Sequence, residues 1–512
     1  MCGLFGWLWL VSLTGIARAG DPPSKETEAA EETEDTGDTP DEPLARPSRR
    51  RPGQPKPTPS LDDRPAPPEP PLDPAAQLQR VSERQRWRLV EAVGVNEHWW
   101  DPYHQNTLKG DRPLVGGWFL RLDGISDTRV VHTPDATSLA SLLAVGGSFL
   151  HGDTAFQAPD VRLTGLALVD PLAGAVGLRT GFIDLRLRIQ SARYDFDGLR
   201  IGLQPIKSDH RGLVYRDQQP SVRLYGRRAN NRLQYALLAG RRLPVRTDVP
   251  TIDPQHLELA DTLGMATLTV QDVARPGLDV LGGALWVHGS PAHPRDLAYA
   301  TLGADGHLGR LNLTGAATLL VGEDSRYGDV LAGEVVLEPS VDLDWMRLRG
   351  SFLRASGDAR PGDGQARGFD AVREQADLAG SLNSAWVQAT LTDPSGLSVG
   401  RTQGWLLAPR TDAMDIGLEG PGLQLAGVGV DAVLVPTLRA HIDVNHLQVV
   451  EPTPAGRRLG TDLSAGLTWR PWFNDVVSLR AGGGVVRGGP ALHPWTGHDH
   501  LAVAQSQLLL RY

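Results

Sequence analysis

From about residue 117 to the C-terminus, apolar and polar residues alternate one by one along the chain. In the stretch 310–320, one side of an extended chain would carry Leu311, Leu313, Gly315, Ala317 and Leu319. The other side would carry Arg310, Asn312, Thr314, Ala316 and Thr318. A period of two is typical of a β-strand with one face against an apolar medium and the other against a polar one.

This alternation predicts a long series of strands. The predicted strands lie at 117–126, 139–150, 160–170, 183–190, 198–204, 220–226, 232–241, 263–272, 278–288, 298–305, 308–320, 330–338, 343–355, 383–392, 397–407, 413–419, 422–434, 437–449, 460–470, 475–486 and 501–512. A soluble β-sandwich would show the same alternation. However, many segments reach the roughly 9–11 residues that cross a bilayer at a tilt, and no long helix interrupts the series. We therefore predict an all-β, transmembrane antiparallel β-barrel of about 14–18 strands over residues 117–512.

The last strand ends in an aromatic residue. Leu508, Leu510 and Tyr512 share one side, whereas Gln505, Gln507 and Arg511 share the other. A terminal aromatic preceded by apolar residues at alternate positions resembles the sorting signal of outer-membrane barrels. The resemblance implies that the barrel-assembly machinery inserts this chain into the bacterial outer membrane, where lipid surrounds it.

The N-terminal residues have a different composition. The apolar run from Leu4 to Ile16 is too short to span a bilayer, and Ala17-Arg18-Ala19 fits a cleavage site, so residues 1–19 are predicted to be a signal peptide. A membrane anchor is the alternative. Residues 20–80 are acidic and then rich in proline, which predicts a disordered periplasmic tether. Residues 81–116 are predicted to form a short helix and a luminal or periplasmic segment.

Composition excludes several other classes. The only cysteine, Cys2, lies in the predicted signal peptide, so the mature chain has no thiol for a disulfide, a zinc site or catalysis. The formal net charge of −9 gives no support to nucleic-acid binding. Ser148 and His151 would point to opposite sides of a strand, and no Ser–His pair would be held on one strand face near an acid, so we do not expect an enzyme.

Several islands between about residues 96 and 486 resemble a known family. They are the short sequence segments 99–106, 108–111, 151–156, 209–212, 217–220 and 303–309. These segments resemble the sequences of an uncharacterised proteobacterial family of predicted, porin-like outer-membrane barrels. A further stretch, 355–370, resembles a loop of alginate-export-type porins. The two resemblances imply a monomeric barrel that conducts a solute.

Charged and aromatic residues suggest where function would lie. Asp358, Asp363 and Asp370 offer hard oxygen ligands on a glycine-rich loop, which suits calcium, although a solvated hairpin loop explains them as well. No other cofactor is expected. His493, His498 and His500 could take up zinc, but an exposed loop without a carboxylate set is the preferred interpretation.

Two further groups of residues are predicted to line the pore. The first comprises His98, Trp99, Trp100, Asp101 and His104, which would form either a constriction in the lumen or a structural latch for the first strand. The second comprises two inward pairs, Arg186 with Arg188 and Arg347 with Arg349, which would bias ion passage or simply pair with acidic neighbours.

These patterns favour an outer-membrane, porin-like channel for passive or substrate-selective passage of a hydrophilic solute. One alternative is a plugged scaffold barrel whose tail at 20–80 binds a periplasmic partner. A weaker alternative is a polysaccharide exporter, which rests only on the loop resemblance.

Overall fold

The computed structural model describes most of the chain beyond residue 98. The described residues are 99–100, 106–134, 137–152, 158–191, 194–244, 252, 260–273, 275–372, 378–379, 383–385, 418–472, 474–493 and 498–512. The predicted signal peptide, tether and short helix lie outside them. Among the described residues, no helix has the length and hydropathy to cross a membrane.

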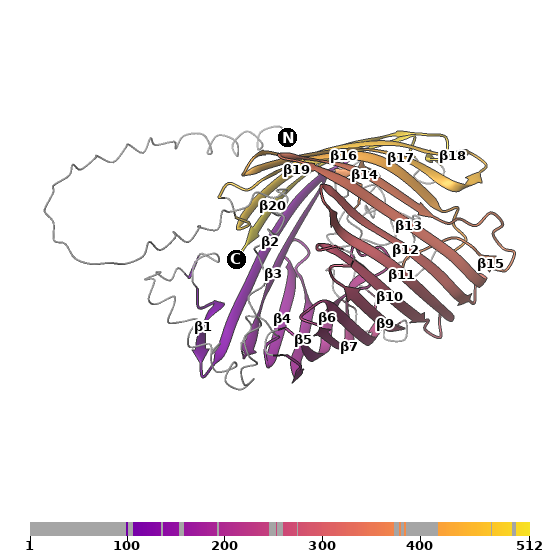
Figure 1. Ribbon diagram of the computed structural model, residues 1–512. Coiled ribbons are helices and arrows are strands. Elements are labelled where there is room, and N and C mark those ends of the chain that lie inside the picture. The colour runs from indigo at the N-terminus through magenta and orange to yellow at the C-terminus, as the bar shows by residue number, and fades with distance from the viewer. Residues whose placement is uncertain are drawn as a thin grey trace, which may run out of the picture. The chain divides into compact units, whose positions relative to one another are not determined.

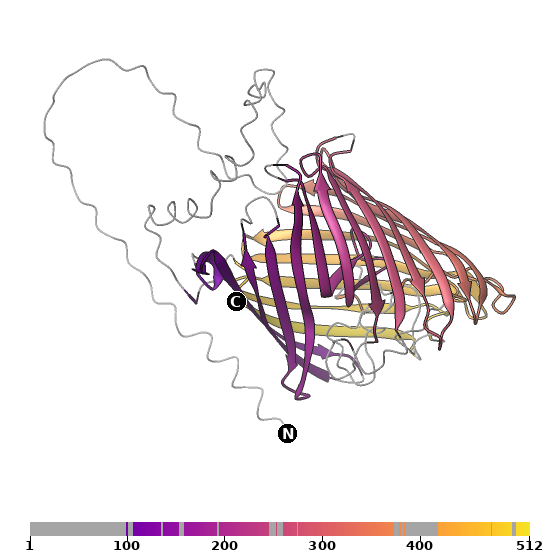
Figure 2. The ribbon, with the colours of Figure 1, turned by 90° about the horizontal axis from the view of Figure 1, so that it is seen from below.

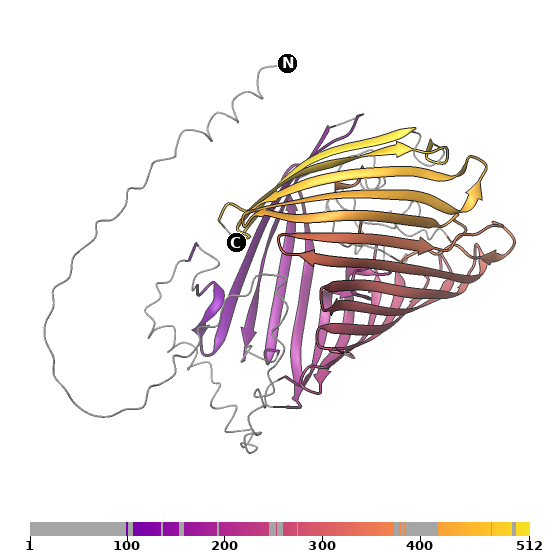
Figure 3. The ribbon, with the colours of Figure 1, turned by 45° about the horizontal axis from the view of Figure 1, so that its top comes forward.

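The described residues contain twenty strands, which form one sheet (Figures 1 and 3). They are β1 (Lys109–Val115), β2 (Trp118–His132), β3 (Thr137–His151), β4 (Val161–Asp170), β5 (Ala175–Ile189), β6 (Phe196–Lys207), β7 (Arg216–Arg228), β8 (Leu233–Arg242), β9 (Asp261–Val270), β10 (Leu278–His288), β11 (Arg295–Leu308), β12 (Leu311–Asp324), β13 (Gly328–Leu343), β14 (Met346–Ala355), β15 (Gln365–Ala366), β16 (Leu423–Val435), β17 (Leu438–Thr453), β18 (Gly456–Trp469), β19 (Val477–Gly488) and β20 (His500–Arg511).

Eighteen of these strands close into a ring, which is seen from another side in Figure 2. Each ring strand pairs antiparallel with the next, β14 pairs directly with β16, and β20 pairs with β2 over Ile125–His132. The ring leaves out β1, which pairs only with β2, and the two-residue β15, which pairs in parallel with β13. An antiparallel barrel within the predicted range of 14–18 strands is therefore confirmed.

Each ring strand overlaps one strand predicted from the sequence. The other three predicted strands, 383–392, 397–407 and 413–419, fall almost entirely outside the described residues. The ring strands have 10 to 16 residues, which is long enough to cross a bilayer at a tilt. Closure matters in such a setting, because hydrocarbon offers no partner for the backbone groups of a free strand edge.

The outward face of the wall is apolar. Leu302, Leu331 and Val428 are each more than 60% exposed, whereas the adjacent Thr301 and Ala332 are almost fully buried. The alternation read from the sequence thus separates an outer, hydrocarbon-type surface from an inner surface. Trp345, in the β13–β14 turn, and Trp469 and Trp472, at the β18–β19 connection, are also exposed, as expected where a barrel meets the lipid headgroups.

The two ends of the barrel differ in their connections. At one end, short turns join neighbouring strands, including two-residue turns at 309–310 and 344–345, where Gly309 and Asp344 adopt positive φ angles. At the opposite end, longer segments connect the strands, at 208–215, 356–422 and 489–499. Short periplasmic turns and long external loops are the usual arrangement in outer-membrane barrels.

The C-terminal residue is held at the seam where the ring closes. Tyr512 exchanges two backbone hydrogen bonds with Gly124 of β2, at 2.8 and 3.1 Å. Its hydroxyl accepts a hydrogen bond from the Asn106 amide at 3.2 Å and contacts the Trp99 carbonyl. The Lys109 ammonium lies 4.5 Å from the centre of its ring. The segment before β2 is thus tied to the end of the chain.

Candidate functional site in the barrel lumen

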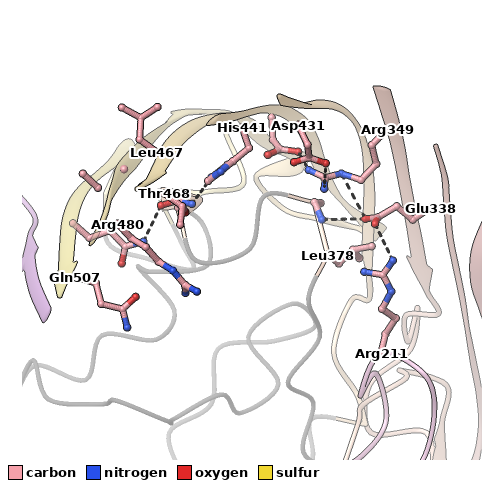
Figure 4. A pocket seen from close by; sticks show the side chains of 16 residues that line it. Arg211, Glu338, Arg349, Leu378, Asp431, His441, Leu467, Thr468, Arg480 and Gln507 are labelled. Atoms are coloured by element: carbon pink, nitrogen blue, oxygen red, sulfur yellow. Dashed lines mark hydrogen bonds and ion pairs between the residues drawn. The ribbon is translucent and has the colours of Figure 1, made fainter. Parts of the chain in front are cut away.

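A cavity of about 310 Å³ opens on the inner side of the wall (Figure 4). Its polar lining comes from the inner faces of β13, β14 and β16–β20 and from two inward segments, 208–215 and a second one described at 378–379 and 383–385. The charged and polar residues of the lining are Arg211, Glu338, Asn383, Arg349, Asp431, His441, Asp443, Thr468, Arg480, Gln505 and Gln507.

Arg349 is the centre of the ion pairs around this cavity. Its guanidinium lies 3.1 Å from the Asp431 carboxylate and 3.9 Å from that of Glu338, and it donates a hydrogen bond to Asp443. The Asp443 side chain is only 1% exposed and that of Glu338 only 7%. One arginine therefore compensates carboxylates that are largely removed from water, which ties β13, β14, β16 and β17 together.

The first inward segment, 208–215, connects β6 to β7 and folds around Asp209. The two carboxylate oxygens accept hydrogen bonds from four backbone N–H groups, those of Arg211, Gly212, Leu213 and Val214, at 2.6 to 3.1 Å. The Ser208 hydroxyl donates a fifth, at 2.9 Å. Because these bonds lie within the segment, it has a fixed shape of its own.

The same segment packs against the inner wall of strands other than its own. Leu213, Val214 and Tyr215 are at most 2% exposed and pack with Tyr299 and other residues of the inner wall. Beside them, the Arg211 guanidinium donates to Thr314 of β12 at 3.1 Å and to Glu338 of β13 at 3.2 Å. A loop between β6 and β7 thus reaches strands that lie far along the ring.

In the second inward segment, residues 383–385 lie against glycines of the wall. Gly466, Gly482 and Gly484 face these residues from β18 and β19, and a Cβ at any of the three glycines would come within 3 Å of Asn383 or Ala385. Asn383 contacts His441 and accepts a hydrogen bond from Gln505 at 3.0 Å. The glycines therefore make room for one wall of the cavity.

Arg480 is a cationic residue of the cavity lining that forms no ion pair with the described residues. Its guanidinium has no ion-pair partner among the described residues, and its cross-strand neighbours are Thr468 and Gln507. Arg211 and Arg349, by contrast, are paired with carboxylates. A solute anion entering the cavity would meet Arg480 without displacing a carboxylate of the protein.

A second group of arginines lies on the inner wall of β4 to β7. Arg162, Asp184, Arg200 and Arg223 stand directly opposite one another on these four strands. Asp184, 2% exposed, accepts hydrogen bonds from Arg162 at 2.6 Å, Arg200 at 2.8 Å and the Tyr225 hydroxyl at 2.6 Å. Three guanidinium groups thus face one carboxylate, so this part of the lumen carries excess positive charge.

Of the predicted pore-lining arginines, Arg186 and Arg188 do not act as a pair. A bulge at Leu187 places Arg186 opposite Gly198 and Arg188 opposite Asp197, which are adjacent and therefore on opposite faces. The prediction that they share a face is wrong, because a regular alternation does not allow for the extra residue. Arg186 instead pairs with Asp160 and donates to the Ala158 carbonyl.

The other arginine pair, Arg347 and Arg349, does share the inner face of β14. Arg349 belongs to the cavity, whereas Arg347 lies at the short-turn end, where it pairs with Asp342 at 2.5 Å. The Arg347 side chain is 48% exposed, against 16% for Arg349. The two residues therefore have different surroundings despite their equivalent position in the pattern.

The predicted aromatic constriction is only partly described. His98, Asp101 and His104 lie outside the described residues. Trp99 and Trp100 are 65% and 60% exposed, and the Trp99 carbonyl accepts hydrogen bonds from Asn106 and Tyr512. The described part of this segment therefore lies at the seam of the barrel rather than against the cavity.

The three aspartates predicted to hold calcium do not come together. Asp358 accepts hydrogen bonds from the backbone of Arg360 and Arg367, at 2.8 and 3.3 Å. The Gln365 N–H and the Arg367 guanidinium hold the pKa of Asp363 below its usual value. The described part of the chain has no group of three histidine or acidic residues that could hold a metal ion. The calcium prediction is thus not supported, because these carboxylates stabilise their own loop.

A zinc site at His493, His498 and His500 is not supported either. His493 lies 3.3 Å from the Asp499 carboxylate, and no three-residue ligand set forms around it among the described residues.

Comparison with known proteins gives matches among solved structures. No family model matches the chain, and no curated protein matches it. Among solved structures, it is similar to the outer-membrane protein OpdK of Pseudomonas aeruginosa, with 14% identity, a TM-score of 0.48, and coverage of 77% of this chain and 98% of that one. It is also similar to OpdF of the same organism, solved with glucuronate, with 12% identity, a TM-score of 0.48, and coverage of 77% of this chain and 97% of that one. For OccK11 of Pseudomonas aeruginosa the identity is 12%, the TM-score is 0.45, and the coverage is 77% of this chain and 95% of that one.

These similarities say nothing about the solute of this chain, and the barrel is already established by its own strand pairing. None of the three proteins is named as an alginate exporter. The resemblance of residues 355–370 to such porins therefore stays an expectation from the sequence.

Proposed function

We propose that the chain is a porin-like channel of the bacterial outer membrane that passes a small hydrophilic solute. The observation that carries the proposal is a closed, outwardly apolar barrel whose inner wall holds a cavity lined by charged and amide side chains. Such a wall replaces part of the hydration of a polar solute, while inward segments set the size of the passage.

The charges of the lumen favour an anionic solute. Arg480 has no ion-pair partner among the described residues, and the row on β4 to β7 has three arginines for one aspartate. Fixed positive charge inside a narrow pore raises the local concentration of anions and lowers that of cations. A carboxylate- or phosphate-bearing molecule of modest size fits these surroundings.

Planar-bilayer recording of the purified protein tests this function. We expect discrete conductance steps and, under a salt gradient, a reversal potential on the anion-selective side. The variant Arg480→Gln should still conduct but select anions less strongly, because it removes one unpaired positive charge without changing the wall. Absence of conductance steps under all conditions would contradict the channel, and cation selectivity would contradict the anionic solute.

A plugged scaffold barrel is the second candidate, because apolar residues fill part of the interior. Inner-wall residues such as Leu297 and Leu320 belong to one buried cluster with Tyr215 of the segment 208–215 and Phe369 of the connection between β15 and β16. In that case residues 20–80 would bind a periplasmic partner. Deleting residues 20–80 separates the two functions: a channel keeps its conductance, whereas a scaffold loses its partner.

A further inference from the structure

Exposed arginine and histidine side chains lie on the outward face of β14 and of β17 to β20, at the end of the barrel where the long connections lie. Arg354 stands between Leu353 and Ala355, which are both fully buried, so its side chain points away from the lumen. His446 and Arg487 likewise alternate with buried residues of the inner face. The outer basic patch, as we define it, comprises Arg354, His446, Arg458, Arg487 and His500.

The patch begins at one level of the wall. One row of directly opposite residues on β17 to β20 consists of His446, Thr461, Arg487 and His500. The next outward row toward the short turns consists of Val444, Leu463, Val485 and Ala502. Successive outward residues of a strand are about 6.6 Å apart, so the basic side chains start one step beyond the lipid-facing surface.

A second polar row lies further from that surface. It consists of Arg354, Gln424, Gln448 and Arg458, directly opposite one another on β14 and β16 to β18. The Arg354 guanidinium donates a hydrogen bond to the side-chain oxygen of Gln424 at 3.3 Å. Among the described residues, no carboxylate forms an ion pair with a member of the patch, so its charges are available to an external anion.

The patch is not a general property of the barrel rim. At the same end of the barrel, three exposed acidic residues lie directly opposite one another on β11 to β13, namely Asp296, Glu323 and Asp329. At the short-turn end of β17 to β20, the outward row is uncharged and consists of Leu438, Trp469, Leu479 and Leu508. The basic charge is therefore confined to one part of the wall and to one membrane surface.

The chemistry of the patch suits phosphate. Each arginine presents a planar fork of N–H groups that matches the oxygens of a phosphate group, and the histidine rings add further donors. Because the apolar rows begin immediately beside these donors, a phosphate bound there would lie at the level of the lipid headgroups. The long loops of an outer-membrane barrel face the outside, where the leaflet consists of lipopolysaccharide, a glycolipid with phosphate groups on its sugars.

We propose that the outer basic patch binds the phosphate groups of lipopolysaccharide in the outer leaflet, with the acyl chains along the apolar rows of β17 to β20. The patch would hold this lipid against one part of the wall, whereas the acidic row on β11 to β13 would repel it. The proposal rests on the position of the barrel in the outer membrane and is independent of the channel function.

Fluorescence quenching in the full-length protein tests the proposal. The protein is reconstituted in neutral phosphatidylcholine vesicles that contain a small fraction of spin-labelled lipopolysaccharide, with EDTA present so that no divalent cation bridges phosphate to carboxylate. A fluorophore is attached at Val444→Cys, two residues from His446, or at Val321→Cys, two residues from Glu323. Both valines are 40% exposed on the outward face. Quenching should be stronger at Val444→Cys, because the lipid collects at the basic patch.

The double substitution Arg458→Gln with Arg487→Gln should abolish this preference. Each basic residue near an anionic lipid surface contributes about fivefold to binding, so the loss of two should weaken it by about 25-fold. Quenching at Val444→Cys should then fall to the level at Val321→Cys. The control Arg241→Gln, an exposed arginine on the outward face of β8, should leave the preference unchanged.

Lipopolysaccharide from which the phosphate groups have been removed provides the second comparison. This lipid, carrying the same spin label, should quench both positions equally. Equal quenching at both positions by the phosphorylated lipid would overturn the proposal. A preference that persists in the double variant, or without phosphate, would also overturn it.

Discussion

Replacing Arg349 with methionine is expected to destabilise the barrel by about 3–5 kcal/mol, the usual cost of removing one partner from a buried ion pair. The substitution keeps most of the apolar stem but leaves Asp443, 1% exposed, and Glu338, 7% exposed, with less compensation. It also changes the balance of charge at the cavity by one unit. We therefore expect a lower free energy of unfolding in lipid vesicles and a reversal potential displaced toward cations.

The matched control is Arg347→Met, two residues earlier on the same face. Its side chain is 48% exposed and, within the part of the chain that the structure describes, forms an ion pair only with Asp342. Exposed pairs of this kind contribute about 0–1 kcal/mol, so the control should unfold nearly as the wild type does. Equal effects of the two substitutions would show that Arg349 does not compensate the buried carboxylates.

A single methyl group at Gly484 is expected to displace the second inward segment. A Cβ at this position would lie 2.7 Å from the Asn383 carbonyl oxygen and 2.9 Å from the Ala385 nitrogen. The hydrogen bond from the Ala385 N–H to Asp462, 3.1 Å long, should be lost as the segment moves away from the wall. We expect Gly484→Ala to lower stability by about 1–3 kcal/mol, as overpacking does, and to reduce conductance as the segment moves into the lumen.

Gly165→Ala is the corresponding control on the opposite surface. A Cβ at Gly165, on β4, would meet nothing within 4 Å, so this variant should keep wild-type stability and conductance. If Gly484→Ala matched this control in both measurements, the close contact between β19 and residues 383–385 would be refuted.

The barrel could be predicted from the sequence because lipid and water impose opposite demands on alternate residues. The pattern on residues 310–320 places Leu311 and Leu319 outward and Thr318 inward, as the exposed fractions confirm. The exact ends of the strands were harder to predict from the sequence. For example, β5 begins at Ala175, whereas the predicted strand begins at residue 183. The intervening residues include a register shift, which interrupts the alternation.

The lumen was predicted less well than the wall. Alternation could have indicated that Asp443 and Arg480 face inward, since apolar residues flank each of them. It could not show that Arg211 reaches Glu338, which is 127 residues away, because that contact depends on how 208–215 folds around Asp209. Nor could it find the bulge at Leu187, which turns Arg186 and Arg188 to different faces.

The segment before the barrel illustrates a further limit. Its polar and aromatic residues were compatible with a constriction or a latch, and sequence offered no way to place them. The described contacts, from Trp99 and Asn106 to Tyr512, lie at the closing seam. The aromatic C-terminus, read from the sequence as a sorting signal, therefore also has a structural role in the folded chain.

The most direct test of the account concerns the two faces of one strand. Cys2 lies in the predicted signal peptide, so a cysteine introduced into the mature chain would be its only thiol. On β17, Ile442 is 53% exposed on the outer face, and the adjacent His441 lines the cavity. In the reconstituted protein, a fluorophore at Ile442→Cys should be quenched by lipid-borne spin labels, and His441→Cys should react with a water-soluble thiol reagent. The reverse result, or identical behaviour at both positions, would contradict a barrel with a lipid-facing exterior and an aqueous lumen.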